Sequence, residues 1–290
     1  MSNKGKTKIS VKKEAILMDF LLEKMGGMSR TKIKSLLKNN QVLVNELSVS
    51  KFDCQLKSGD IVEIDSAKKI VPLNGKIKII YEDESIIVVD KGVGILTNSL
   101  INKKEKSVYN NLIEYFKAKN LKNTLFYVHR LDRDTSGVLL FAKKKYVQTI
   151  LKDNWHNDEH EKIYFALVEG EAEKEFGTIT SWLTEDQKSK KMYSCNFDNG
   201  GQLAISNYIV IQRTKKFTLL QVELLTGRKN QIRVQMQSIG HPVVGDEKYG
   251  AKSNPINRLG LHATSLTIKH PETGKMITFE SKMPKMFNKF

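Results

Sequence analysis

The sequence predicts an α+β protein, in which a small N-terminal α/β unit precedes a larger domain built on a mixed, mainly antiparallel sheet. Residues 13–66 combine two helical apolar patterns with short strand patterns, whereas residues 77–290 are dominated by strand-like runs with few helices. Strands and helices do not alternate regularly in this second part, so a doubly wound sheet is not expected. Pro72 and Gly75 interrupt the chain between the two parts, and residues 67–76 are therefore predicted to be a linker.

The N-terminal unit starts with a Lys-rich stretch, residues 1–12, which we expect to be a flexible basic tail. Apolar residues at helical spacing then predict a helix that ends at Gly26-Gly27. Ser29 is placed to cap a second helix over residues 30–38. Short strand patterns follow, at residues 41–44 and 61–64, each next to a turn rich in Asn, Gly or Asp.

One face of the second predicted helix is basic. Arg30, Lys34 and Lys38 lie four residues apart and therefore share an exposed side of the helix. Such a row of cations occurs on ordinary solvated helices as well as on surfaces that bind phosphate groups. The spacing alone leaves both interpretations open.

The larger part of the chain is rich in apolar and β-branched runs of strand length. They predict strands at residues 78–81, 85–90, 138–142, 164–169, 217–225 and 266–269. Helical spacing appears only near residues 108–119, 145–154 and 230–238. This balance indicates one sheet with a few covering helices.

Charge is the strongest compositional feature. The chain has 48 Lys and Arg against 32 Asp and Glu, a formal net charge of +16, which favours a polyanion such as nucleic acid as partner. No apolar run approaches the ~20 residues of a membrane span. The N-terminus has no apolar signal core, and the two cysteines lie far apart. We therefore expect a cytoplasmic protein without a membrane partner.

The segment HRLDRDTSG, residues 129–137, holds the most informative carboxylate. Asp132 stands between Arg130 and Arg133, in a loop that enters the strand pattern at residues 138–142. Nearby cations keep a carboxylate ionised, and loops at the ends of buried strands often carry functional groups. An ionised Asp132 is suited to be a salt-bridge partner, a metal ligand or a nucleophile. The histidines of the chain lie in no metal-ligand spacing, so no metal is predicted.

Four ordered blocks of sequence resemble one enzyme family. Residues 129–137 meet every fixed position of His-Arg-Leu-Asp-x-x-Thr-Ser-Gly, the signature of the RluA-type pseudouridine synthases. Residues 226–234 resemble the Gly-Arg-x-His-Gln-Ile-Arg-Val segment of the same family, and residues 241–250 its His-Pro-x-x-Gly-Asp-x-x-Tyr-Gly segment. Lys162-Ile163-Tyr164 matches the Lys-x-Tyr of the family. In addition, residues 13–66 resemble the S4 RNA-binding module.

The family resemblance implies an isomerase that converts uridine to pseudouridine in structured RNA, without a cofactor. It implies that Asp132 is the nucleophile and that Arg233 pairs with this carboxylate and orients it in a bidentate manner. Tyr164 is implied to stack on the target base, with help in proton removal from C5 as a second role. Arg130 is implied to enter the stack that the flipped uridine leaves.

The S4 resemblance implies that Arg30, Lys34 and Lys38 track an RNA backbone. It favours large-subunit ribosomal RNA over tRNA as substrate, and we expect the enzyme to be a monomer. Two alternatives are a tRNA pseudouridine synthase and a non-catalytic RNA-binding assembly factor. The second would be favoured by loss of the catalytic residues, which are all present.

Three positions depart from the family pattern. Asn230 and Gln235 replace two usual histidines on either side of Arg233, and we expect these changes to alter how the arginine is supported. Gly92 replaces a usual proline, which is expected to loosen its loop.

Overall fold

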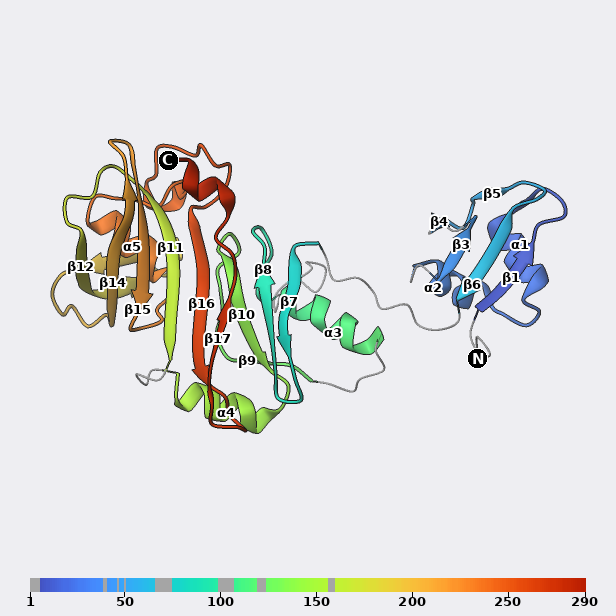
Figure 1. Cartoon of the computed structure of the whole chain (residues 1–290), viewed down its shortest axis with the longest axis horizontal. Coiled ribbons are helices and arrows are strands. Elements are labelled where there is room, and N and C mark those ends of the chain that lie inside the picture. The colour runs from blue at the N-terminus through green and yellow to red at the C-terminus, as the bar shows by residue number, and fades with distance from the viewer. Residues whose placement is uncertain are drawn as a thin grey trace. The chain divides into compact units, whose positions relative to one another are not determined.

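The structure is a computed structural model that describes residues 6–38, 41–45, 47–49, 51–65, 75–98, 107–118, 124–155 and 160–290 (Figure 1). Contacts divide the chain into two compact units, the first comprising residues 1–72 and 112–123 and the second residues 73–111 and 124–290. Residues 66–74, which contain most of the predicted linker, lie outside the described ranges. Within those ranges, no helix combines the length and apolar character that crossing a bilayer requires.

The first unit contains a four-stranded antiparallel sheet with two helices. The sheet order is β1-β6-β3-β4, with β1 at Lys6–Ser10, β6 at Ile61–Asp65, β3 at Val42–Val44 and β4 at Leu47–Ser48. The helices are α1 (Leu17–Lys24) and α2 (Arg30–Lys38), and a separate strand pair joins β2 (Ala15–Ile16) to β5 (Gln55–Leu56). The two helices and the sheet share one apolar core, which includes Phe20, Ile33 and Val62.

The expected flexible tail over residues 1–12 is wrong for most of its length. Strand β1 pairs antiparallel with β6, so that Ile9 lies opposite Val62. Val11 is only 1% exposed, and Ile9 packs against the core of the unit. The basic composition suggested a solvated tail. However, this stretch pairs with strand β6, and its apolar residues Ile9 and Val11 pack into the core. Residues 1–5 lie outside the described residues.

Helix α2 begins and packs as its sequence predicts. The backbone N–H of Lys32 donates to Ser29 Oγ over 3.2 Å, which is the N-cap hydrogen bond. Ile33 and Leu37 are buried, whereas Arg30 and Lys34 are exposed. Lys38 is the last residue of the helix, and its side chain lies outside the described part of the chain.

The two turns of the first unit are hydrogen-bonded to one another. Asn45 has φ 50°, a left-handed conformation that Asn tolerates well. Its Nδ2 donates to Asp60 Oδ1 over 2.8 Å, and its Oδ1 accepts from the backbone N–H of Ile61 over 2.9 Å. The predicted Asn turn and Gly-Asp turn thus form one structural element that holds β3 against β6. Glu46, also predicted in the first turn, lies outside the described residues.

The second unit is built on an 11-stranded sheet in which one strand pair, β10 with β16, is parallel and the other pairings are antiparallel. The main order is β13-β12-β14-β15-β11-β16-β10-β8-β7, with β17 on β16 and β9 on β10. The strands are β7 (Ile77–Glu82), β8 (Ile86–Lys91), β9 (Phe126–Tyr127), β10 (Ser136–Ala142), β11 (Glu161–Glu169), β12 (Phe176–Glu185), β13 (Met192–Cys195), β14 (Gln202–Arg213), β15 (Phe217–Leu224), β16 (Leu261–Lys269) and β17 (Met276–Glu280). The predicted α+β class with a mixed, mainly antiparallel sheet is confirmed.

Few helices accompany this sheet: α4 (Lys145–Asp153), α5 (Gln231–Ser238) and the short 3-10 helices η1 (Glu247–Tyr249) and η2 (Lys285–Lys289). Helix α3 (Val108–Ala118) begins in the second unit, and its residues from Leu112 onward belong to the first. Helix α4 packs Val147 and Leu151 against β8, β10 and β16. Helix α5 packs Ile232 and Met236 against β11 and β15 (Figure 1). Helices α4 and α5 therefore cover two different apolar clusters of the sheet, and Tyr164 packs against the cluster under α5.

The sequence analysis did not predict the two long strands β12 and β14. In β12 and β14 the apolar residues are interrupted by Thr, Ser, Asn and Gln. One side of each strand remains largely exposed, with Phe176 and Ile209 among the exposed apolar residues. Partial burial gives a weaker periodic signal than the continuous apolar run of β10, where every residue is buried.

Candidate active site

The HRLDRDTSG segment forms the loop between β9 and β10, and the fold fixes its end through the parallel strand pair. Gly137 pairs with Ala263 of β16 and has φ 114°. A Cβ at this position would lie 2.0 Å from the carbonyl oxygen of Ala263, so no other residue fits there. The close approach of β10 to β16 thus explains why the segment ends in glycine.

Hydrogen bonds from the side chain of Lys91 hold this loop in place. The ammonium of Lys91, which is completely buried, donates to the carbonyl oxygens of Gly92, Ile95 and Arg133 over 2.8–3.0 Å. Burial lowers the pKa of Lys91 to about 7, and the charges of Asp134 and Asp132 act in the opposite direction. Because three carbonyl oxygens surround the three N–H donors of an ammonium, Lys91 ties the strand end of β8 to the loop that carries Asp132.

Gly92 makes a close backbone contact that the usual proline could not make. Its N–H donates to the carbonyl oxygen of Lys76 over 2.6 Å, a bond that proline cannot make. A Cβ at this position would lie 2.9 Å from the same oxygen. Glycine therefore suits this close backbone contact.

The structure brings Arg233 to Asp132, as the resemblance implied, but with a different geometry. Arg233 Nη1 donates one hydrogen bond to Asp132 Oδ2, over 3.0 Å. The bidentate pair is formed with Asp246 instead, from Nε over 2.6 Å and from Nη2 over 2.8 Å. The expected bidentate contact with Asp132 is therefore wrong, because Nε and Nη2 of the guanidinium both donate to Asp246.

Asp246 is a residue of the site that the sequence analysis did not single out. Its side chain is 1% exposed, against 23% for Asp132. Although burial disfavours the charged guanidinium, the hydrogen bonds and charge of Asp246, followed by the charge of Asp132, raise the pKa of Arg233. Asp246 belongs to residues 241–250, which match the Gly-Asp of a family segment. A carboxylate within a matched segment could therefore have indicated a site residue.

The two departures from the family pattern on either side of Arg233 have separate contacts. Asn230 Nδ2 donates to Asp132 Oδ2 over 2.5 Å, so this amide contacts the carboxylate and not the arginine. Gln235 is buried and bridges Ser206 Oγ at 2.6 Å and Ser181 Oγ at 3.0 Å. Gln235 therefore anchors α5 to β14 and β12. The expectation that both residues act by altering the support of Arg233 is not met.

Tyr164 lies on β11 at a register shift between β11 and β16. Such irregularities change the direction of a side chain relative to its strand neighbours. Tyr164 lines the same hollow as Asp132 and Arg233. Burial, together with the charge of Asp132, raises the pKa of Tyr164, so the phenol is protonated at neutral pH.

The hollow around Asp132 is small. Its volume is about 70 Å³, and its lining includes Arg130, Asp132, Tyr164, Asn230 and Arg233. That is room for roughly two water molecules at ~30 Å³ each. Arg130 is exposed, in contrast to the buried Leu131 that follows it. Movement of the exposed Arg130 side chain would widen the hollow for a base.

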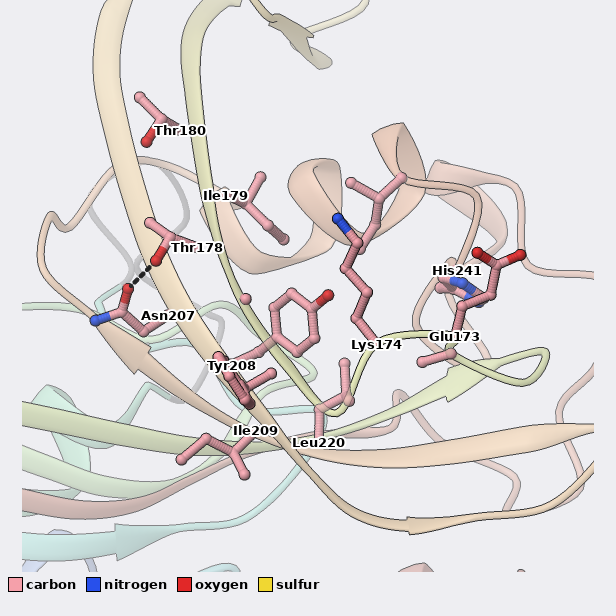
Figure 2. Close-up of a pocket in the computed structure, with 14 residues that line it drawn as sticks. Glu173, Lys174, Thr178, Ile179, Thr180, Asn207, Tyr208, Ile209, Leu220 and His241 are labelled. Atoms are coloured by element: carbon pink, nitrogen blue, oxygen red, sulfur yellow. Dashed lines mark hydrogen bonds between the residues drawn. The ribbon is translucent and has the colours of Figure 1, made fainter.

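A much larger cavity lies elsewhere in the second unit (Figure 2). Its volume is about 930 Å³, and it lies beside β12 and β14, next to the residues that follow α5. Lys174, Tyr208 and His241 are among the side chains that line it. It shares no lining residue with the hollow around Asp132, so cavity size does not locate the carboxylate site in this protein.

The histidines near the loop make structural contacts. His129 Nε2 accepts from the backbone N–H of Leu140 over 3.0 Å, and its ring stacks on Trp155 with the centroids 4.8 Å apart. Burial, with a smaller effect of Lys162, lowers the pKa of His129 to about 3, so the ring is neutral. Among the described residues, no group of three or more His, Cys, Asp or Glu is placed to hold a metal ion.

The cations predicted on the S4-like helix belong to the first unit. Arg30 Nη2 lies 3.8 Å from Asp19 Oδ1, with both side chains well exposed. The ammonium of Lys34 lies 5.3 Å from the ring centroid of Phe52. Arg30 and Lys34 are thus both accessible to solvent.

The fold and the sequence agree with one class of enzyme. The chain matches the solved structure of human RNA pseudouridylate synthase domain containing 1 with a TM-score of 0.60 at 22% identity, over 72% of this chain and 84% of that one. This likeness shows the fold. A family model for RNA pseudouridylate synthase matches residues 85–238, which include Asp132, Tyr164 and Arg233. The chain belongs to the RNA pseudouridine synthases, which are isomerases.

Relatives from several bacteria match nearly the whole chain. An uncharacterized RNA pseudouridine synthase of Bacillus subtilis, YhcT, is 32% identical and covers 88% of this chain and 86% of its own length. Ribosomal large subunit pseudouridine synthase D of Borreliella burgdorferi is 31% identical over 97% of this chain and 90% of its own. Ribosomal large subunit pseudouridine synthase C of Haemophilus influenzae is 29% identical over 91% and 87%.

Proposed function

We propose that this enzyme converts uridine to pseudouridine in large-subunit ribosomal RNA and that Asp132 is its nucleophile. The observation that carries this proposal is the contact of Asp132 with Arg233 and Asn230 in a hollow that Tyr164 also lines. The reaction breaks the bond between ribose C1′ and uracil N1, turns the base and joins it again through C5. It needs a nucleophile and proton transfers but no net oxidation, so the chain's own residues suffice.

The three residues have distinct roles in this proposal. Arg233 orients the carboxylate of Asp132 through the charge-assisted hydrogen bond from Nη1. Tyr164 provides a flat apolar surface for the base. Its raised pKa makes a phenolate unfavourable at neutral pH, which supports stacking and hydrogen bonding by the protonated phenol over action as a strong base.

Arg130 is proposed to occupy the place of the target uridine in the RNA stack. A base inside a folded RNA must be flipped out at a cost of a few kcal/mol, and a planar guanidinium is able to stack on the neighbouring bases. The exposure of Arg130 at the rim of the hollow supports this role, since its outward movement would also enlarge the hollow for the base.

Ribosomal RNA is proposed as the substrate over tRNA for two reasons. Two of the relatives are ribosomal large subunit pseudouridine synthases by name. The N-terminal unit, which we propose to be an S4-type RNA-binding domain, presents Arg30 and Lys34 on an exposed helix face. The enzyme is proposed to act as a monomer, without a cofactor.

Release of tritium from C5-tritiated uridine tests the proposed function directly. The purified protein is incubated with tritiated large-subunit ribosomal RNA, with tritiated small-subunit ribosomal RNA and with a tritiated tRNA pool. Release from the large-subunit RNA alone is the expected result. Release from tRNA alone would replace the proposed substrate, whereas absence of release from all three RNAs and from assembled subunits would favour an assembly factor without catalysis.

The basic face of α2 is expected to contribute to RNA affinity. Replacing Arg30, Lys34 and Lys38 by Gln should weaken binding and flatten the dependence of log K on log salt by roughly 0.7–0.9 for each lost phosphate contact. The matched control exchanges the same three residues between Arg and Lys, which preserves the charge and should preserve the slope. An unchanged slope in the Gln variant would show that RNA does not contact this face.

A further inference from the structure

The two oxygens of the Asp132 carboxylate have different surroundings. Oδ2 accepts hydrogen bonds from Asn230 Nδ2 and from Arg233 Nη1, at 2.5 and 3.0 Å. Within the described part of the chain, no residue donates to Oδ1. The carboxylate is therefore held by one oxygen, and the other is available to a molecule in the hollow.

The Asn230 amide is held on both sides, by Asp132 and by Tyr249. The backbone N–H of Met192 donates to the hydroxyl oxygen of Tyr249 over 3.1 Å. The hydroxyl group of Tyr249 in turn donates to Asn230 Oδ1 over 3.1 Å. Because an ionised carboxylate can only accept, the NH₂ group faces Asp132, and Oδ1 on the other side accepts from the hydroxyl group of Tyr249. Tyr249 is completely buried, so its ring cannot readily turn away.

The backbone at Asn230 suits an amide in this place. Asn230 has φ 53° and ψ 24° and directly precedes helix α5. Among residues other than glycine, Asn is one of the few that adopt this left-handed conformation readily. Asn230 and Arg233 thus reach Asp132 from the N-terminal end of one helix, and the hydrogen-bond chain from Met192 sets the direction of one of the two donors.

We infer that Asn230 is a positioning residue which, oriented by Tyr249, holds Oδ2 of Asp132 and thereby presents Oδ1 to the RNA substrate. The inference rests on the proposed role of Asp132 and extends it to the choice of carboxylate oxygen. The family pattern has histidine at this position, whose imidazole titrates near neutral pH. The amide of Asn230 gains and loses no proton there, so the donor to Asp132 is constant across that range.

Other charged and titratable groups also act on this carboxylate. Asp246 pairs with Arg233, and Arg130 and Arg228 line the same hollow. The groups that interact electrostatically with Asp132 are Arg233, Lys248, Tyr249, Tyr164 and Lys91. A test of Asn230 must therefore keep these groups unchanged and alter only the donor. Replacement of the amide by a carboxyl group of the same shape meets this condition.

The variant Asn230→Asp is predicted to have a distinctive pH profile. At pH 8 the new carboxylate cannot donate and repels Asp132, so kcat for tritium release should fall at least roughly tenfold with KM within about twofold. The neighbouring carboxylate raises the pKa of the new group, and as pH falls its protonated form again donates an O–H to Asp132. The kcat of the variant should therefore recover toward acid pH relative to wild type.

Two further variants complete the test. Asn257 also has φ 53° but is exposed, so Asn257→Asp is the matched control and should keep the wild-type profile. Tyr249→Phe removes the hydroxyl that fixes the amide, and should lower kcat without acid recovery. If Asn230→Asp does not fold, Tyr249→Phe alone tests whether the oriented amide of Asn230 contributes to kcat.

A readout that does not require turnover separates this inference from the proposed function. In ¹⁵N-labelled wild-type protein, the side-chain amide of Asn230, assigned by its loss in Asn230→Asp, should exchange slowly with solvent. It should exchange faster in Tyr249→Phe. Wild-type kcat and pH profile in an active Asn230→Asp enzyme, or rapid amide exchange in the wild type, would overturn the inference. Failure of the proposed function would instead appear as absence of tritium release from the wild type with a protected amide.

Discussion

Asp132→Asn is expected to abolish tritium release while leaving the fold and RNA binding intact. The substitution keeps the shape of the side chain and an oxygen that can accept from Asn230 and Arg233, but removes the negative charge. Loss of a nucleophile that acts together with its partners typically costs about 10⁴-fold or more in kcat. Single-turnover tritium release with saturating enzyme measures the chemical step, and a filter-binding titration measures RNA affinity separately.

A nearby carboxylate provides the control for this prediction. Asp134 is exposed and lies two residues further along the same loop, at a variable position of the family signature. Asp134→Asn should retain activity within a few-fold of the wild type. If Asp132→Asn retained turnover close to that of Asp134→Asn, Asp132 could not be the nucleophile.

Arg233→Met is expected to reduce both stability and activity. The substitution leaves the Asp246 carboxylate, which is 1% exposed, without its two hydrogen bonds from the guanidinium. Breaking a buried ion pair by removing one partner costs about 3–5 kcal/mol of unfolding free energy. Urea unfolding should show a lower midpoint with a similar slope. Tritium release should also be lost, because Asp132 loses its only guanidinium contact among the described residues.

A second substitution separates the two effects of Arg233. In the double variant Arg233→Met, Asp246→Asn, the buried negative charge is removed, so much of the lost stability should return. Activity should not return, since Asp132 still lacks its cation. Lys144→Met, which breaks an exposed pair with Glu272, is the control and should leave the urea midpoint close to that of the wild type. Recovery of activity in the double variant would contradict the role given to Arg233.

Local signals in the sequence were sufficient for the elements with strong periodicity. Helix α2 begins at Arg30 after the Ser29 cap, and β10 is an uninterrupted buried run. Strand β1 and the half-exposed strands β12 and β14 were not predicted. Strand β1 forms by pairing with β6, which is distant in the sequence. In β12 and β14, burial on one side only leaves a weak apolar pattern.

The sequence by itself determined the class of the protein. Motif matches around Asp132, Tyr164 and Arg233 indicated the family, and these three residues line one hollow in the structure. Motifs are contiguous, so they identify residue types that a loop or helix must contain. They do not determine which atoms of different motifs form hydrogen bonds in the folded protein.

Only the tertiary structure decided the contacts of the carboxylate. Asn230 and Arg233 lie 98 and 101 residues from Asp132 in the sequence, and the buried Asp246 takes the fork of Arg233 that was expected to face Asp132. A side chain's hydrogen-bond partner depends on which groups the packed sheet and helix α5 bring within about 3 Å of it. These distances exist only once the sheet and α5 have packed together. No single segment of the sequence could therefore predict that Asn230 and Arg233 both donate to Oδ2 of Asp132.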